Sequence, residues 1–319
     1  MCRTRGKRSM SKQKLVIIAG PTASGKSKLA LDVASVLNGV VINADSMQVY
    51  KNTPILSACP SLEDKKVVPH RLYQIWDASV NGSVVDWLNL ATEEIKKTWD
   101  GDKLPVVVGG TGFYIDNLLN GSTPIPETSK ETKEKVKNLI SQYGINYLHD
   151  ELKKFDPEIA HKLSENDVTR VRRAWEVFYD TGKTLTEWYH APLIKKLNNV
   201  DTFVIKIIPQ KQELDKRCFL RFDQMMEKGA LQEVENLMKL NLEPNLPAMK
   251  ALGVPELMAY LKNEISLDEA ISLGKLHTRQ YAKRQKTWFN NKLSADFVLD
   301  CCYSNQSFLI DNVIKFVKS

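Results

Sequence analysis

The chain has 319 residues, of which 43% are hydrophobic and 26% are charged, and its formal net charge is +7. This composition is typical of a globular protein, and no apolar run reaches the ~20 residues that cross a bilayer, so a membrane protein is excluded. The five cysteines form no C-x-x-C pair, which excludes a cysteine zinc site and a disulfide framework and favours the cytoplasm. The positive charge is compatible with a nucleic-acid partner.

The N-terminal residues 1–14 are basic, and no apolar stretch follows them. A secretory signal is therefore not expected, and translation can begin at Met1 or at Met10.

Short β-branched runs then alternate with helical periodicity. The pattern predicts strands at 14–20, 40–43, 70–77 and 104–110, a helix after the first of them, and a helix over 84–100. A further strand is predicted at 202–208. Strands that alternate with helices form a parallel sheet covered on both faces, so the expected class is α/β.

Residues 123–195 interrupt this alternation, because they hold charged helical stretches and no predicted strand. The sequence therefore predicts a helical insertion over 123–195 in an α/β core made of 12–122 and 196–319. After residue 210 the core is expected to be mostly helical, with a loop-rich break at 243–255.

A phosphate-binding pattern follows the first predicted strand. Gly20-x-x-x-x-Gly25-Lys26-Ser27 lies between a strand and a helix, which is the context of a P-loop. The glycines allow successive N–H groups to face an anion, Lys26 adds a positive charge, and Ser27 can ligate Mg²⁺. The expected phosphate ligands are Gly20, Thr22, Ala23, Ser24, Gly25, Lys26 and Ser27. A plain glycine turn before a helix does not explain Lys26 and Ser27.

Polar residues follow two other predicted strands, at the edge of the sheet where ligands bind. Asp45 is suited to a general base facing the phosphate, or alternatively to the N-cap of a helix. Thr111 follows the glycines at 109–110, and its hydroxyl is suited to capping the next helix or to binding a phosphate or the attacking group. Spacing alone leaves both choices open.

Seven segments occur in a specific order: GPTASGKS, ADSMQVY, VPHRL, VGGTGFYIDNLL, DVTRVRRAWEVFYDTGKTLTE, MKALGVPEL and TRQYAKRQKTWF. Together they resemble the tRNA dimethylallyltransferase family of bacterial type, from about residue 14 to 290. The resemblance implies a P-loop NTPase-like fold and a P-loop that holds the pyrophosphate of dimethylallyl diphosphate, together with Mg²⁺. It also implies transfer of the dimethylallyl group to N6 of the adenosine 3′-adjacent to the anticodon, in tRNAs that read codons starting with U.

The resemblance assigns catalytic roles to three residues. Asp45 matches the general base, Thr111 a residue near the reacting centre, and Arg221 the arginine that stabilises the pyrophosphate. Alternatively, Glu213 pairs with Arg217, and Arg221 is a solvated side chain.

The resemblance also implies contacts with a tRNA anticodon stem-loop, held in part by the insertion. The matching residues are Asp45, Ser46, Met47, Gln48, Thr111, Lys133, Thr169, Arg170, Val171, Arg172, Arg173, Lys250, Ala251, Leu252, Gly253, Val254 and Pro255. Val254 and Pro255 depart from many relatives. Surface charge with an Arg172–Glu176 pair is the simpler interpretation of the arginines. Residues 275–292 carry six basic residues and no acidic one, which favours RNA or pyrophosphate contact over a solvated face.

Three alternatives use the same P-loop: an adenylate isopentenyltransferase that makes cytokinin, a small-molecule kinase, and an RNA-binding module that uses the P-loop as a switch. The insertion and the RNA-contact segments disfavour the first two, and a module would not need Asp45. We expect a monomer that has dimethylallyl diphosphate and tRNA as partners and does not associate with a membrane.

Overall fold

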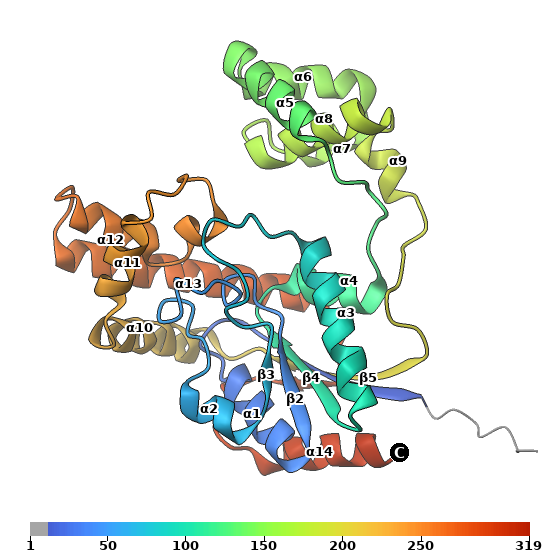
Figure 1. Cartoon of the computed structure of the whole chain (residues 1–319), viewed down its shortest axis with the longest axis vertical. Coiled ribbons are helices and arrows are strands. Elements are labelled where there is room, and N and C mark those ends of the chain that lie inside the picture. Colours follow the sequence, from blue (N-terminus) through green and yellow to red (C-terminus); the bar gives the residue numbers. More distant parts are fainter. Residues whose placement is uncertain (1–11) are drawn as a thin grey trace, which may run out of the picture. The chain divides into compact units, whose positions relative to one another are not determined.

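The computed structural model describes residues 12–319, so the choice between Met1 and Met10 lies outside the described residues. The chain divides into two compact units. One unit joins the segment that ends at Leu119 to Lys196–Ser319, and the other is Asn120–Lys195 (Figure 1). We call them the core unit and the insertion unit and describe each by itself.

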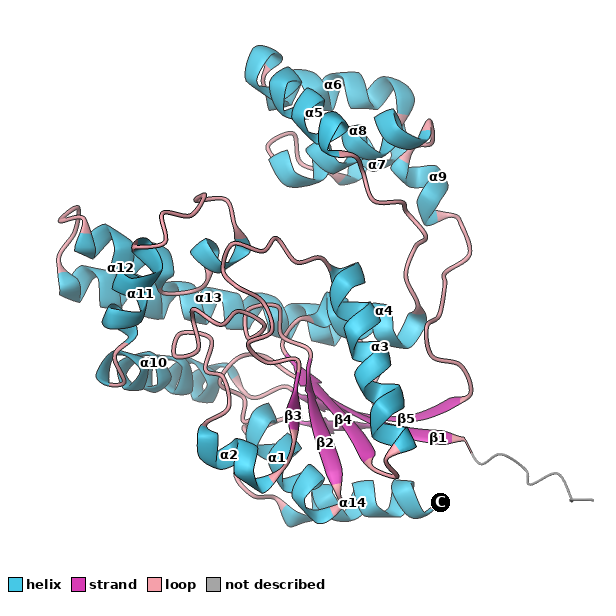
Figure 2. Cartoon of the chain, viewed as in Figure 1, coloured by secondary structure: helices cyan, strands magenta, loops and turns pink. Residues whose placement is uncertain are grey.

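The core unit contains one parallel sheet. Its strands are β1 (Gln13–Ala19), β2 (Gly39–Asn43), β3 (His70–Arg71), β4 (Leu104–Gly109), β5 (Val200–Ile207) and β6 (Phe297–Leu299). Their order is β3-β2-β4-β1-β5-β6, and every pairing is parallel. Figure 2 shows the sheet in magenta. The predicted α/β class is confirmed.

Alternate residues of the strands enter two separate cores. In β1, Leu15 and Ile17 belong to one cluster, and Val16 and Ile18 belong to the other, as the two-residue period of a strand requires. Because both faces of the sheet are covered, the strands consist of continuous apolar runs rather than alternating ones.

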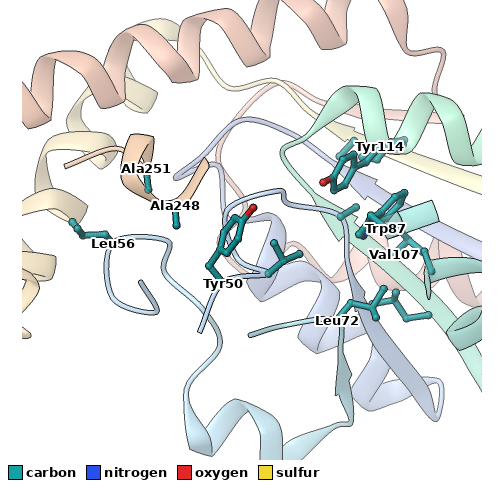
Figure 3. Close-up of a cluster of buried hydrophobic side chains, with 14 of the residues drawn as sticks. Tyr50, Leu56, Leu72, Trp87, Val107, Tyr114, Ala248 and Ala251 are labelled. Atoms are coloured by element: carbon teal, nitrogen blue, oxygen red, sulfur yellow. The ribbon is translucent and has the colours of Figure 1, made fainter. Parts of the chain in front are cut away.

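Helices cover both faces of the sheet. The cluster that contains Leu15 also holds side chains of α3 (Val84–Asp100), α4 (Gly112–Asn120), α11 (Ala230–Met238), α12 (Val254–Leu261) and α13 (Leu267–Lys292). The opposite cluster holds α1 (Lys26–Val36) and α14 (Ser307–Lys318). Figure 3 shows part of the first cluster, where the rings of Trp87 and Tyr114 stack with centroids 4.4 Å apart. Helix α10 (Lys211–Glu227) packs on α13, where Leu214 and Cys218 of α10 contact Ala282 of α13.

The insertion unit is helical. It consists of α5 (Lys130–Tyr143), α6 (Ile145–Phe155), α7 (Pro157–Lys162), α8 (Val168–Thr181) and α9 (Leu185–Tyr189) around its own apolar core. Asp156 joins two of these helices, because its carboxylate accepts hydrogen bonds from the backbone N–H groups of Ile159 and Thr186.

One predicted strand was too long, and two short elements were not predicted. The strand predicted at 70–77 forms only over His70–Arg71, because Leu72 and Gln74 adopt positive φ angles of 64° and 54°. Trp76 then makes an isolated parallel bridge with Tyr50. The sequence pattern also missed α2 (Leu62–Val67) and the short edge strand β6. No helix within residues 12–319 combines the length and the apolar character needed to span a bilayer.

Candidate active site

The carboxyl ends of three neighbouring strands bring together the segments singled out in the sequence. β4 lies between β2 and β1, so Asp45, Thr111 and the loop at 20–25 follow adjacent strands. The turns after β2 and β4 approach so closely that a Cβ at Gly109 would lie 2.0 Å from the backbone oxygen of Ala44. Only glycine fits there, and ligands of open parallel sheets bind at this edge.

The loop between β1 and α1 has the conformation of an anion cradle. Ala23 and Gly25 have φ angles of 62° and 90°, which turns successive backbone N–H groups toward one side. Helix α1 begins at Lys26 directly after this turn, so its positive N-terminal end adds to the field. Ser24 is fully buried, and its Oγ has no hydrogen-bond partner among the described residues.

Lys26 is buried beside this loop, and its Nζ donates to the backbone oxygen of Pro21 at 3.3 Å. Burial lowers the pKa of Lys26 to about 8, and the carboxylate of Asp45 opposes that shift. A buried ammonium group without a full counter-charge is costly, so an anion in the loop would restore its ordinary pKa.

Arg221 reaches the same loop from α10. Its Nη1 donates to the hydroxyl of Thr22 at 3.2 Å. Burial lowers the pKa of Arg221, and Asp45 opposes the shift, as it does for Lys26. The alternative of a solvated Arg221 beside a Glu213–Arg217 pair is therefore wrong: Arg221 contacts the loop, and the Glu213 carboxylate accepts a hydrogen bond from the backbone N–H of Cys302.

Asp45 is held by its own turn. Its Oδ1 accepts the backbone N–H of Met47 at 3.0 Å, and the side chain of Asn43 bonds to both the N–H and the backbone oxygen of Asp45. No helix begins directly after Asp45, since the next one starts at Leu62, so the N-cap interpretation of this residue is wrong. Asp45 lies close enough to Lys26 and Arg221 for its negative charge to oppose the lowering of both pKa values, so it belongs to the same site.

The hydroxyl of Thr111 is directed to the turn after β2. Thr111 Oγ1 accepts the backbone N–H of Ser46 at 2.9 Å and donates to Ser46 Oγ at 3.1 Å. It therefore joins the turns after β4 and β2, a role that spacing did not predict.

The sequence pattern of the IPP transferase family matches residues 48–292, which is more than two thirds of the chain. The chain belongs to this family. It is 41% identical over 297 residues to a tRNA dimethylallyltransferase of Rickettsia conorii, which covers 93% of this chain and 81% of the relative.

Solved structures of this family are similar over nearly the whole chain. The full-length tRNA isopentenylpyrophosphate transferase of Bacillus halodurans is 33% identical with a TM-score of 0.68, covering 96% of both chains. A eukaryotic dimethylallyltransferase crystallised acting on tRNA is 29% identical with a TM-score of 0.83, covering 96% of this chain and 80% of the other.

Four of the predicted RNA contacts have buried side chains. Gln48, Val171, Ala251 and Val254 are 6%, 0%, 3% and 0% exposed. The amide of Gln48 donates to the backbone oxygens of Ser57 and Ala58, and the other three side chains pack in apolar cores. Each of these side chains is occupied inside the protein, as the helical spacing of α8 predicts for Val171, and RNA contact at these four positions stays a prediction.

The other predicted positions of the core unit, except Gly253, remain accessible. Ser46 and Met47 are half-buried beside Asp45, Leu252 is half-buried, and Lys250 and Pro255 are exposed. Gly253 is buried, and its N–H donates to the carboxylate of Glu256 at 3.0 Å.

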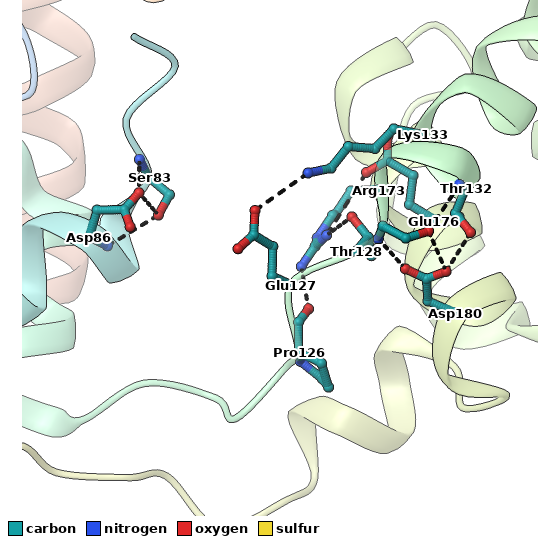
Figure 4. A network of polar contacts seen from close by, with 11 residues as sticks. Ser83, Asp86, Pro126, Glu127, Thr128, Thr132, Lys133, Arg173, Glu176 and Asp180 are labelled. Carbon is teal, nitrogen blue, oxygen red and sulfur yellow. Dashed lines mark hydrogen bonds and ion pairs between the residues drawn. The ribbon is translucent and has the colours of Figure 1, made fainter.

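The predicted basic residues of the insertion unit take part in local contacts, and Figure 4 shows those of Lys133 and Arg173. Arg173 donates to the hydroxyl of Thr128 at 3.0 Å and to the backbone oxygen of Pro126, and Lys133 lies 3.7 Å from Glu127. Arg172 forms the expected pair with Glu176 at 3.3 Å. Arg170 has a longer contact of 3.5 Å with Asp167, and its side chain is 72% exposed. Thr169 is also exposed.

Helix α13 contributes basic residues and one contact that the sequence analysis missed. Lys283, Arg284 and Lys292 line a cavity of about 520 Å³ together with Trp288. The missed residue is Gln285, whose side chain bonds to both glycine turns of the site. Gln285 lies in the segment TRQYAKRQKTWF, so the motif could have indicated it, but the prediction rested on the basic residues of that segment.

Proposed function

We propose that the chain transfers a dimethylallyl group from dimethylallyl diphosphate to N6 of the adenosine 3′-adjacent to the anticodon, in tRNAs that read codons starting with U. Pyrophosphate is released. The observation that carries this proposal is the meeting of the anion cradle, Arg221 and Asp45 at one edge of the sheet. The names of the similar proteins support it.

The loop, Lys26 and Arg221 bind the diphosphate and stabilise its departure. The backbone N–H groups of the loop hold the phosphates, and Lys26 and Arg221 stabilise the negative charge that grows on pyrophosphate as the allylic C–O bond breaks. Donors aimed at developing charge contribute about 3–4 kcal/mol each to rate acceleration.

The turns after β2 and β4 act on the acceptor, the adenosine. The N6 amino group is a weak nucleophile, because its lone pair is delocalised into the adenine ring. Asp45 accepts the N6 proton as the new C–N bond forms, and Thr111 holds the turn that carries Asp45 through its bonds to Ser46.

Mg²⁺ fits this site as a companion of the diphosphate. The described residues contain no cluster of three or more His, Cys, Asp or Glu side chains that would cage a metal ion by themselves. Mg²⁺ is commonly held by substrate phosphates, water and one or two protein oxygens, and the exposed hydroxyl of Ser27 is such an oxygen. When bound, the ion neutralises charge on the pyrophosphate.

The tRNA contacts that we propose are the accessible members of the predicted set. They are Asp45, Ser46, Met47, Thr111, Lys133, Thr169, Arg170, Arg172, Arg173, Lys250, Leu252 and Pro255. The exposed arginines of α8 are suited to phosphate contacts of the anticodon stem, and the residues near Asp45 to the base that is turned out of its stack.

The test uses purified protein, Mg²⁺ and dimethylallyl diphosphate with unmodified tRNA, AMP or ATP as separate acceptors. The nucleosides are released by digestion and identified by mass spectrometry. We expect one dimethylallyl-adenosine in tRNA and no change in the free nucleotides. Modified AMP or ATP would identify cytokinin synthesis instead, and hydrolysis of ATP without transfer would identify a kinase-like activity.

A further inference from the structure

Gln285 connects the two glycine turns of the site through its side-chain amide. Its Oε1 accepts the backbone N–H of Thr22 at 2.8 Å, and its Nε2 donates to the backbone oxygen of Gly110 at 2.8 Å. The residue is only 6% exposed. Because the N–H of Thr22 can only donate and the oxygen of Gly110 can only accept, one orientation of the amide satisfies both.

Each end of this bridge lies next to a reacting group. On the diphosphate side, the hydroxyl of Thr22 accepts the hydrogen bond from Arg221. On the acceptor side, a Cβ placed on Gly110 would lie 2.4 Å from Gln285 Nε2 and 3.2 Å from Asp45 Oδ2, so the amide and the carboxylate border the same turn. The Gln285 amide therefore links the loop that holds the leaving group to the turn that flanks the base.

The amide is itself held in place. The phenol of Tyr281, one helical turn earlier on α13, lies beside the side chain of Gln285. Helix α13 packs into the large core through Ala270 and Phe289 on either side of this pair, so it provides a rigid mount. A side chain on a rigid helix that is hydrogen-bonded to both loops transmits the position of one loop to the other.

We propose that Gln285 is a positioning residue for the transfer reaction, which sets the separation between the diphosphate loop and the Asp45 turn. This inference rests on the function proposed above. The allylic carbon and the N6 atom must approach within about 3–3.5 Å in line with the leaving oxygen, and an error of about 1 Å costs on the order of 10²-fold in rate. A further consequence is that the N–H of Thr22 is already paired, so the later N–H groups of the loop hold the phosphates.

The first test compares Gln285→Met with Gln224→Met, which makes the same change at an exposed position of α10. We expect kcat to fall by about 30- to 100-fold in Gln285→Met, with the dissociation constant of pyrophosphate within about 3-fold of the wild type. Gln224→Met should match the wild type. Urea unfolding of both variants measures any loss of fold. An unchanged kcat in Gln285→Met would overturn the proposal, as would a fall in kcat that is matched by an equal loss of pyrophosphate binding.

The second test, Gln285→Glu, separates positioning from general stability. A protonated glutamic acid can still accept from Thr22 and donate to Gly110, whereas the ionised form has no donor and repels Asp45. The charged groups around this turn are Asp45, Lys26 and Arg221, with the phenol of Tyr281 beside them. We expect the ratio of variant to wild-type kcat to rise at least 5-fold as the pH falls from 8 to 6, and a ratio that does not change would overturn the proposal.

The wild type is the reference in both tests. A wild type that transfers nothing to tRNA would overturn the proposed function and this role together. Wild-type turnover with an unaffected Gln285→Met would overturn only the role of Gln285.

Discussion

The backbone N–H of Ser46 donates to the hydroxyl of Thr111, with 2.9 Å between nitrogen and oxygen. The same hydroxyl donates to Ser46 Oγ at 3.1 Å. Through this pair of bonds the turn after β4 holds the turn after β2, and Asp45 lies in the latter. The position of the proposed base therefore depends on a side chain that follows a different strand.

Replacing Thr111 by Val should lower kcat by about 10- to 100-fold. Valine has nearly the same shape but offers no oxygen, so the partly buried N–H of Ser46 loses its partner at a cost of about 1–3 kcal/mol. Thr111→Ser keeps the hydroxyl and should retain most of the activity. Single-turnover transfer to tRNA, with diphosphate saturating, checks both variants. Equal rates for the valine and serine variants would contradict this role of the hydroxyl.

Replacing Asp45 by Asn should remove the base while keeping its turn. The amide oxygen of asparagine can still accept the N–H of Met47, as Oδ1 of Asp45 does at 3.0 Å. General-base catalysis contributes about 10²- to 10⁴-fold, so we expect the single-turnover rate to fall by that factor. Pyrophosphate binding should be retained or slightly strengthened, because a negative charge near the cradle is removed. An unchanged rate would show that Asp45 is not the base.

Much of the core of the site could be predicted from the sequence, because its parts are encoded by local patterns. The glycine spacing with Lys26 defines the P-loop, and the apolar runs of β1, β2 and β4 place polar residues just beyond their ends. In a parallel sheet all carboxyl ends meet at one edge. Asp45 and Thr111 could therefore be placed near the loop without knowledge of the strand order.

The rest depends on tertiary contacts that leave no local pattern. Gln285 lies 263 positions from Thr22 in the chain, and nothing in its neighbourhood on α13 indicates a hydrogen bond to that residue. The burial of Val254 could not be predicted, because a short loop motif does not say which of its side chains point inward. The strand β6 was missed because three residues at a sheet edge give too short a signal.

Pyrophosphate binding should weaken as the pH rises through about 8. The pKa of Lys26 is lowered to about 8 by burial, so the free protein loses this charge above that pH. A bound anion favours the charged form, so its dissociation constant should increase by up to about 10-fold per pH unit between the pKa of the free protein and that of the complex. Titration calorimetry from pH 6.5 to 9.5 measures this trend. Binding that does not change over the range would contradict it.

The same group should affect stability in the opposite direction from its role in binding. Between pH 8 and 10.5 the unfolded chain binds a proton at Lys26 that the folded chain has lost. Lys26 therefore makes the free energy of unfolding increase as the pH rises through this range. Below pH 8 the cost of the buried charge is fully present. Lys26→Met should therefore raise the free energy of unfolding at pH 7 by about 1–3 kcal/mol while it weakens pyrophosphate binding. Urea unfolding checks the sign, and a destabilised variant would contradict it.

Two arginines on α8 should behave differently when each is replaced by alanine. Arg170 is 72% exposed, so Arg170→Ala should leave stability unchanged, raise the KM for tRNA and reduce the slope of log KM against log salt by about 0.7–0.9. Arg173 donates to Thr128 and to the backbone of Pro126, so Arg173→Ala should lower the free energy of unfolding by about 1–2 kcal/mol. Salt-dependent kinetics and urea unfolding of both variants separate the two effects. If Arg170→Ala leaves the salt slope unchanged, Arg170 does not contact a phosphate, and the positive charge on this part of α8 serves only its ion pair with Asp167.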